Sequence, residues 1–276
     1  MRFYEKVLTP EEVAQLEKVR IDDLGFGYDK FGANREVVFN TYAVVKNFYE
    51  KYFRVESFGT ENVPATGRAI LASNHSGTLP LDGMMIAIDI FKHVNPPRLM
   101  RAVVDRFAAS LPFVGEFLAR CGQVIGTRRN FQELLENEEM VAVFPEGAKA
   151  LGKKYSQRYK LYPFNMGFVE LALTYKAPII PVAVVGAEEQ MPVLADLKPL
   201  ANALGFPYIP ITPTILPIPF PVHYRIYYGE PLHYYKQFAE DTVQNPEMVR
   251  ELARDVQERV QRMIDIGLAD RKGVFV

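Results

Sequence analysis

The chain has 276 residues, which is enough for one large domain or for one domain with a helical appendage. Hydrophobic residues make up 49% of the chain and charged residues 24%, values that exclude an intrinsically disordered protein. The formal net charge of −1 gives nucleic-acid binding no bulk electrostatic support, so we expect no nucleic-acid partner.

We expect neither a secretory signal nor a membrane-spanning helix. Met1-Arg2-Phe3 leads into charged residues instead of an apolar core. The nearest candidate for a span, residues 204–222, contains six prolines and is predicted to form an extended apolar loop. The single cysteine, Cys121, cannot form an internal disulfide, which fits a reducing compartment. These features predict a cytoplasmic protein.

Residues 1–54 are predicted to form a helical pair. Residues 9–12, Thr-Pro-Glu-Glu, make a capping box with proline at the first helical position, and apolar residues then recur at helical spacing. A glycine-rich stretch, residues 24–32, separates this helix from a second one over about residues 35–53. The second helix carries several tyrosines on one side.

Residues 55–276 are predicted to form one α/β domain, because short apolar strands alternate with helical stretches. The expected strands cover residues 69–72, 99–104, 124–125, 141–144, 179–185 and 224–228. The expected helices cover residues 82–91, 106–120, 131–136 and 165–175, and a long helix begins at Asn245-Pro246. This alternation favours a largely parallel or mixed sheet flanked by helices.

His75 is the first candidate catalytic residue. It follows directly on the strand at 69–72, where a sheet delivers side chains to a crevice at its carboxyl edge. A histidine here can take a proton from a hydroxyl near neutral pH, and it acts better when a carboxylate holds its other ring nitrogen. Asp82 is the nearest carboxylate in sequence, and Gly77 and Pro80 would allow the chain to turn between them.

A second cluster, Phe144-Pro145-Glu146-Gly147, also follows an apolar strand. Its glycine would let backbone amides approach a ligand, and Glu146 would orient a hydroxyl or hold a basic neighbour. Five cations come next, before any acid: Lys149, Lys153, Lys154, Arg158 and Lys160. Such a run is typical of a solvated loop but would equally hold a phosphate, with Lys149 and Lys153 nearest the motif.

Arg128 and Arg129 form a third basic feature after the strand at 124–125. Two arginines at a strand end can clamp a phosphate, and they can equally be surface charge at the start of a helix. The sequence leaves both interpretations open.

In combination these motifs resemble the glycerolipid acyltransferase family, which includes 1-acylglycerol-3-phosphate acyltransferases. The family's ordered pattern is a His-x4-Asp motif, an arginine block, a Phe-Pro-Glu-Gly block and a proline-bearing apolar strand. Here His75 with Asp82, Arg128, residues 144–147 and residues 180–182 stand in the same order. The spacing between His75 and Asp82 is x6, two residues longer than the pattern, and resembles the branch nearer to diacylglycerol and wax acyltransferases.

The resemblance implies that His75 is a general base and Asp82 its charge partner, with Asp105 as an alternative acid. Asn74, Ser76, Gly77, Arg128, Glu146 and Gly147 would bind substrate. The donor would be acyl-CoA or acyl-carrier protein as co-substrate, without a metal or another cofactor. The acceptor would be a membrane lysophospholipid or, given the longer loop, a neutral lipid such as diacylglycerol or a fatty alcohol.

Membrane contact and two other functions complete the expectations. The N-terminal helical pair resembles a membrane-docking element, and the loop at 204–222 is a second candidate for the interface. Together they predict peripheral association with the cytoplasmic face of a membrane. A lipid hydrolase is opposed by the missing Gly-x-Ser-x-Gly elbow around Ser76 and Cys121. A non-catalytic lipid-binding module on the same fold stays open because of the x6 spacing.

Overall fold

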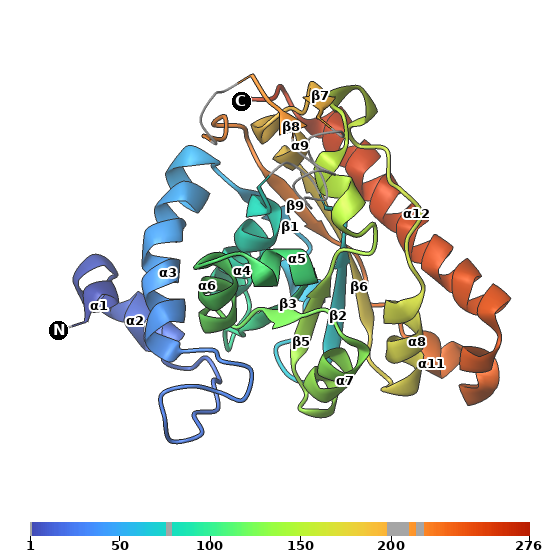
Figure 1. Cartoon of the computed structure of the whole chain (residues 1–276), viewed down its shortest axis with the longest axis horizontal. Helices are drawn as coiled ribbons and strands as arrows, with labels where there is room; N and C mark the ends of the chain where they lie inside the picture. The colour runs from blue at the N-terminus through green and yellow to red at the C-terminus, as the bar shows by residue number, and fades with distance from the viewer. Residues whose placement is uncertain (1, 76–78, 198–209, 214–217) are drawn as a thin grey trace.

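The centre of the molecule is a mixed sheet. The computed structural model describes residues 2–75, 79–197, 210–213 and 218–276, and within them the strand order is β1-β9-β6-β2-β5-β3-β4 (Figure 1). The strands are β1 (Glu56–Phe58), β2 (Ala69–Ser73), β3 (Met100–Val104), β4 (Val124–Ile125), β5 (Met140–Val143), β6 (Ile179–Val185) and β9 (Arg225–Tyr228). Neighbouring strands are parallel except β6 and β9, which confirms the predicted fold class. A small antiparallel pair, β7 (Ala195–Asp196) and β8 (Pro210–Ile211), lies apart from this sheet.

Helices cover both faces of the sheet (Figure 1). On one side lie α1 (Phe3–Val7), α2 (Pro10–Leu16), α3 (Arg35–Asn47) with its π-helical extension η1 (Phe48–Tyr52), α4 (Leu81–His93), α5 (Arg106–Ser110) and α6 (Val114–Arg120). On the other lie α7 (Arg128–Glu136), α8 (Gly167–Thr174), α11 (Tyr234–Gln237) and α12 (Pro246–Asp270). Shorter turns are η2 (Thr60–Asn62), η3 (Ala148–Gly152), η4 (Tyr155–Gln157), α9 (Ala187–Gln190) and η5 (Glu240–Gln244).

The alternation of side chains along the central strands builds two cores. In β2 every residue is buried. Ala69 and Leu71 belong to the core under α3 and α4, whereas Ile70 and Ala72 belong to the core under α7, α8 and α12. Successive side chains of a strand point to opposite faces, so a strand buried on both sides needs apolar residues throughout. This requirement explains why the predicted strands are continuous apolar runs.

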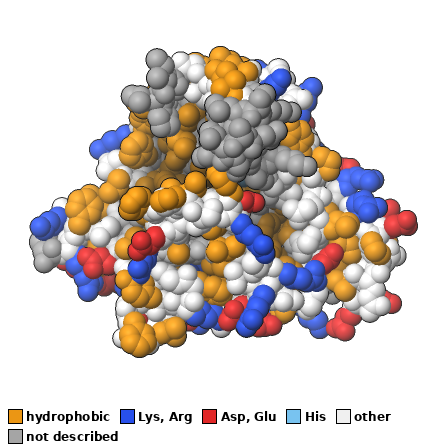
Figure 2. Space-filling model, viewed as in Figure 1, with side chains coloured by type: hydrophobic (Ala, Val, Ile, Leu, Met, Phe, Trp, Pro, Cys, Tyr) orange, Lys and Arg blue, Asp and Glu red, His pale blue; other side chains and the backbone are white. Residues whose placement is uncertain are grey.

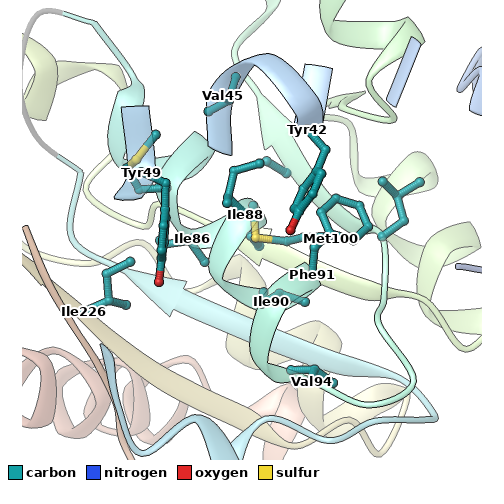
Figure 3. Packing of buried hydrophobic residues seen from close by; sticks show 14 of the residues in the cluster. Tyr42, Val45, Tyr49, Ile86, Ile88, Ile90, Phe91, Val94, Met100 and Ile226 are labelled. Atoms are coloured by element: carbon teal, nitrogen blue, oxygen red, sulfur yellow. The ribbon is translucent and has the colours of Figure 1, made fainter. Parts of the chain in front are cut away.

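The N-terminal helices share the first of these cores (Figure 3). The rings of Tyr42 on α3 and Phe91 on α4 meet edge to face, with their centroids 5.7 Å apart. The Tyr49 hydroxyl donates a hydrogen bond of 2.5 Å to Asp89 on α4. Residues 1–54 therefore pack as part of the same body as the sheet, and most of the aromatic side of α3 is used in this packing.

The structure corrects two predicted elements. The helix expected over residues 106–120 is interrupted, because Pro112 cannot continue α5 and Phe113 turns the chain at a φ of 62°. A Cβ on Gly115 would lie 2.0 Å from the Ala109 carbonyl oxygen, so only glycine allows α5 and α6 to close into this tight hairpin. Strand β1, which the sequence did not predict, pairs with β9 at the edge of the sheet.

About half of the predicted apolar loop at 204–222, residues 204–209 and 214–217, lies outside the described residues. In the part of the chain that the structure describes, no helix is long and apolar enough to cross a bilayer.

Candidate active site

His75 and Asp82 come together at the carboxyl edge of the sheet. β2 ends at Ser73 and delivers His75 to this edge, while Asp82 lies in the first turn of α4. The His75 Nδ1 atom lies 2.8 Å from Asp82 Oδ2. The Asp82 side chain is fully buried and the His75 side chain is 11% exposed. The two-residue-longer spacing therefore does not prevent the contact, and the His75 Nε2 atom makes no hydrogen bond to any described residue.

The His75 ring also stacks on Phe144, with ring centroids 4.1 Å apart and planes inclined by 29°. Phe144 begins the Phe-Pro-Glu-Gly block directly after β5. A Cβ at Gly83 would lie 3.2 Å from Phe144 Cζ, so the glycine after Asp82 leaves the space that this ring occupies. The two motifs thus fix the imidazole from two sides: the carboxylate sets its rotation, and the phenyl ring supports its face.

Glu146 lies behind His75 and is bonded within the protein. Its Oε1 atom accepts a hydrogen bond of 3.3 Å from the His75 backbone N–H. Its Oε2 atom accepts one of 2.7 Å from the Tyr162 backbone N–H and lies 3.2 Å from Lys153 Nζ. Both carboxylate oxygens are occupied in this way, which favours a supporting role for Glu146 over direct contact with substrate.

Lys153 is buried rather than presented to solvent. Its ammonium lies between Glu146 and Glu188, 3.4 Å from Glu188 Oε1. Burial raises the pKa of Glu188 to about 7, outweighing the attraction of the Lys153 charge. Because two carboxylates already surround it, Lys153 is placed to neutralise them and not to meet a phosphate.

The remaining predicted substrate-binding residues are placed differently. Asn74 is fully buried and pairs with the backbone of Val184 on β6. Gly147 adopts a φ of +74°, which explains the glycine, and it lines the cavity described below. Ser76 and Gly77 lie outside the described residues, as does the side chain of Lys149.

Arg128 lies at the same edge of the sheet but away from His75. It begins α7, after β4, and three strand spacings of about 4.8 Å separate β4 from β2. Its side chain is 59% exposed and its Nη1 atom pairs with Glu170 on α8 at 2.6 Å. The structure therefore does not bring Arg128 against the His75–Asp82 pair.

An apolar cavity of about 600 Å³ opens beside His75. It is lined mainly by α3, α4, β3 and α6, and its wall runs along α4 from Gly83 through Ala87 to Phe91. Eight residues of helix span about 12 Å, so the cavity extends about that far from the His75–Asp82 pair. A volume of this size is typical of ligand pockets, and its apolar lining suits a hydrocarbon chain.

Comparison with known proteins decides the family. The family model described as Acyltransferase matches residues 54–185. The uncharacterized protein Rv0502 of Mycobacterium tuberculosis is 35% identical over 284 residues, which cover 97% of this chain and 78% of that protein. The chain belongs to the acyltransferase family. The resemblance noted in the sequence is thereby confirmed.

Three further proteins are similar to this chain in sequence or in fold. The uncharacterized protein ML2427 of Mycobacterium leprae is 39% identical over 83% of this chain, which spans only 64% of that protein. The human "DGAT1/2-independent enzyme synthesizing storage lipids" is 26% identical over 76% of this chain and 60% of its own length. The crystal structure of the 1-acyl-sn-glycerophosphate acyltransferase PlsC from Thermotoga maritima superimposes with a TM-score of 0.56 at 18% identity, covering 87% of this chain and 83% of that one. The acyltransferase fold is therefore shared with PlsC.

The structure gives other surroundings to Asp105, the alternative acid for His75, and to Cys121, a candidate nucleophile of a hydrolase. Asp105 caps α5 by accepting a hydrogen bond of 2.8 Å from Phe107 N–H. Cys121 lines the cavity with its thiol 3.4 Å from Thr41, and burial raises the pKa of that thiol. A thiol that resists ionisation is a poor nucleophile.

The polar segment that follows β6 was not among the predicted site residues. Glu188, Glu189 and Gln190 of α9 are all buried, and each bonds to a different part of the chain around the site. Three consecutive polar residues directly after a buried strand were the available signal.

Proposed function

We propose that the protein transfers a fatty acyl group from an acyl thioester to the hydroxyl of a glycerolipid, with His75 as the general base. The observation that carries this proposal is the His75–Asp82 contact at the mouth of an apolar cavity. The thioester's hydrocarbon chain lies in the cavity, so that its carbonyl carbon stands next to His75.

The reaction proceeds in one transfer without an acyl-enzyme. The acceptor hydroxyl gives its proton to His75 Nε2 while its oxygen attacks the thioester carbonyl. Asp82 stabilises the imidazolium that forms. The C–S bond then breaks, the ester is released, and the imidazolium returns the proton to the departing thiolate. The donor is acyl-CoA or acyl-carrier protein, and this chemistry requires no metal or other cofactor.

Two classes of lipid are candidates for the acyl acceptor. A lysophospholipid agrees with the motif order and with the fold shared with PlsC. A neutral acceptor such as diacylglycerol is favoured by one structural observation: Arg128 and Lys153, two cations predicted to bind phosphate, are each paired with glutamates. The similarity to a relative named for storage-lipid synthesis supports the same alternative.

A panel of acceptors tests the proposal. Palmitoyl-CoA or palmitoyl-carrier protein is offered with lysophosphatidate, other lysophospholipids, monoacylglycerol, diacylglycerol and hexadecanol, and the products are identified by mass spectrometry. His75→Ala should lower kcat about 10²–10⁴-fold on whichever acceptor is used. His233→Ala is the matched control, because His233 follows β9 at the opposite edge of the sheet and contacts Tyr235. Near-normal transfer by His75→Ala would contradict the proposal.

Membrane association is part of the same proposal. Three apolar side chains of the α5–α6 hairpin are exposed: Phe113 by 89%, Val114 by 42% and Phe117 by 43%. Phe117 also lines the cavity, so the exposed hairpin stands where the cavity meets the surface. Hydrophobic side chains gather on the upper left of the face in Figure 2, whereas charged ones gather below and to the right. A phospholipid bilayer in contact with this hairpin would supply acceptor directly to His75.

Flotation on phosphatidylglycerol–phosphatidylcholine vesicles tests the hairpin. Phe113→Ser should reduce the bound fraction, because the most exposed aromatic side chain would lose its burial in the interface. Ile266→Ser is the control, since Ile266 is 53% exposed but lies on α12, outside the segments considered for membrane contact. Equal losses in the two variants would contradict a specific role for the hairpin. The N-terminal helices and residues 204–222 remain further candidates for membrane contact.

A further inference from the structure

The loop that joins His75 to Asp82 is fixed at both ends by one segment, residues 184–190. At the first end, Asn74 stands immediately before His75. Its side-chain amide donates to the Val184 carbonyl at 3.0 Å, and its carbonyl accepts from the Val184 N–H at 2.8 Å. This paired contact sets where His75 leaves the sheet.

At the second end, Gln190 holds the Leu79 carbonyl. Gln190 is fully buried, and its Nε2 atom donates a hydrogen bond of 3.0 Å to Leu79 O. The Leu79 carbonyl also accepts from Leu81 N–H at 2.8 Å, at the first residue of α4. Gln190 therefore contacts the turn that leads into the helix on which Asp82 lies.

Tyr224 determines which way the Gln190 amide faces. Its hydroxyl donates a hydrogen bond of 2.7 Å to Gln190 Oε1. Burial, with a contribution from the charge of Asp82, raises the pKa of Tyr224, so the hydroxyl stays protonated. A carbonyl can only accept, so the donor end of the amide must face Leu79 and the acceptor end must face Tyr224. The two hydrogen bonds therefore run in one direction, from the Tyr224 hydroxyl to Gln190 and from Gln190 to the Leu79 carbonyl.

The N-cap residue of α4 gives its start no side-chain support. Pro80 occupies the N-cap position of α4, and a proline side chain has no oxygen with which to cap the first N–H groups. The spacing between His75 and Asp82 is two residues longer than in the His-x4-Asp pattern. Asp82 must nevertheless meet His75 Nδ1 within hydrogen-bond distance.

We propose that Gln190, oriented by Tyr224, is the positioning residue that allows a His-x6-Asp loop to hold Asp82 against His75. The proposal deepens the acyl-transfer function above and rests on it. Gln190 acts through the Leu79 carbonyl and the start of α4, and it takes no part in proton transfer itself.

The test replaces Gln190 with methionine, which keeps the length of the side chain and removes its donor. We expect kcat of Gln190→Met to fall about 10²-fold, as for a misplacement of about 1 Å in a catalytic group, while KM for palmitoyl-CoA changes little. Tyr224→Phe should cause a smaller fall in kcat, and the double variant should be no worse than Gln190→Met, because both act on one contact. Gln257→Met is the control: the Gln257 side chain on α12 accepts a hydrogen bond of 3.1 Å from the Phe164 backbone N–H, and this variant should keep wild-type kcat.

A second readout needs no substrate. The downfield proton resonance of His75 Nδ1–H reports its bond to Asp82, and we expect it to be lost or shifted upfield in Gln190→Met but unchanged in Gln257→Met. Wild-type kcat and an unshifted resonance in a folded Gln190→Met protein would overturn the proposal. A fall in kcat would also overturn it if the melting temperature fell and the His75 resonance stayed unchanged, because the loss would then reflect general destabilisation. Failure of the acyl-transfer function itself is recognised separately, because wild type would then be inactive on every acceptor while the resonance could still be compared.

Discussion

Asp82 and Asp89 lie about two turns apart on α4, and both side chains are buried, yet their surroundings differ. Asp82 faces His75, whose ring can gain and lose a proton. Asp89 accepts hydrogen bonds from the hydroxyls of Tyr49 at 2.5 Å and Tyr228 at 2.8 Å, whereas the half-exposed His93 lies beyond hydrogen-bond distance, with its Nε2 atom 3.6 Å from Asp89 Oδ1. Burial raises the pKa of both tyrosines, so they remain donors. The partner, and not the carboxylate or its helix, separates a candidate catalytic group from a structural one.

The strongest test of this difference is Asp82→Asn. We expect kcat to fall about 10⁴-fold, because a neutral amide does not stabilise the imidazolium and favours the wrong histidine tautomer. The melting temperature should stay close to that of wild type. Asp89→Asn is the matched change on the same helix and should keep wild-type kcat. A loss of similar size in both variants would show that the two carboxylates do not differ in role.

Removing Asp89 should affect stability instead. Asp89→Ala leaves two buried tyrosine hydroxyls without their acceptor, and we expect the free energy of unfolding to fall by about 3 kcal/mol. Urea denaturation measures this. Glu116→Ala, which removes an exposed pair with Arg120, should change the free energy by less than about 0.5 kcal/mol. Unchanged stability of Asp89→Ala would mean that the tyrosines find water or other partners.

Ala87 lies between the two aspartates on α4 and lines the cavity. Phenylalanine at this position should fill the space of about three methylenes, at about 0.8 kcal/mol each, and lower kcat/KM for palmitoyl-CoA about 50-fold. Butyryl-CoA, whose four-carbon chain is too short to pass the one helical turn between Gly83 and Ala87, should be affected much less. Equal losses for the two donors would place the acyl chain outside this cavity.

Glu188 is a third buried carboxylate, and its pKa of about 7 predicts a pH dependence. The ordinary value is 4.5, so the folded state binds this proton more tightly than the unfolded state does. Protonation of Glu188 therefore adds to the free energy of unfolding at acid pH, and this contribution is lost as the pH rises toward 7. Glu188→Gln should therefore reduce the fall in the free energy of unfolding between pH 5 and 7 by about 2 kcal/mol, as measured by urea denaturation at each pH. Identical slopes in the variant and wild type would contradict this assignment.

Much of the fold was predictable because the central strands are buried on both faces. Continuous apolar runs such as residues 179–185 have few alternative structures, and their polar ends identified the edge that holds His75. The contact of His75 with Asp82 was expected from the loop residues, although the spacing left its existence open. Strand β1 was missed because its three residues carry no apolar run and depend on β9 for pairing.

The less predictable features depend on contacts between distant segments. Lys153 reads as one member of a solvated basic run, and only the fold places Glu188 beside it. Arg128 stands in the expected order, yet Glu170 engages its side chain. Motif order reports which residues reach an edge of the sheet. It does not report which of them already have partners there.

Helix α3, which packs against the same core as α4, also forms part of the cavity wall. The match to the acyltransferase family begins at residue 54, whereas Val38, Thr41 and Tyr42 on α3 line the cavity. One wall of the cavity is therefore encoded outside the segment that carries the catalytic motifs. Evolution, or a designer who grafts a different α3 onto the same motifs, can change which hydrocarbon chains fit the cavity without altering His75 or Asp82.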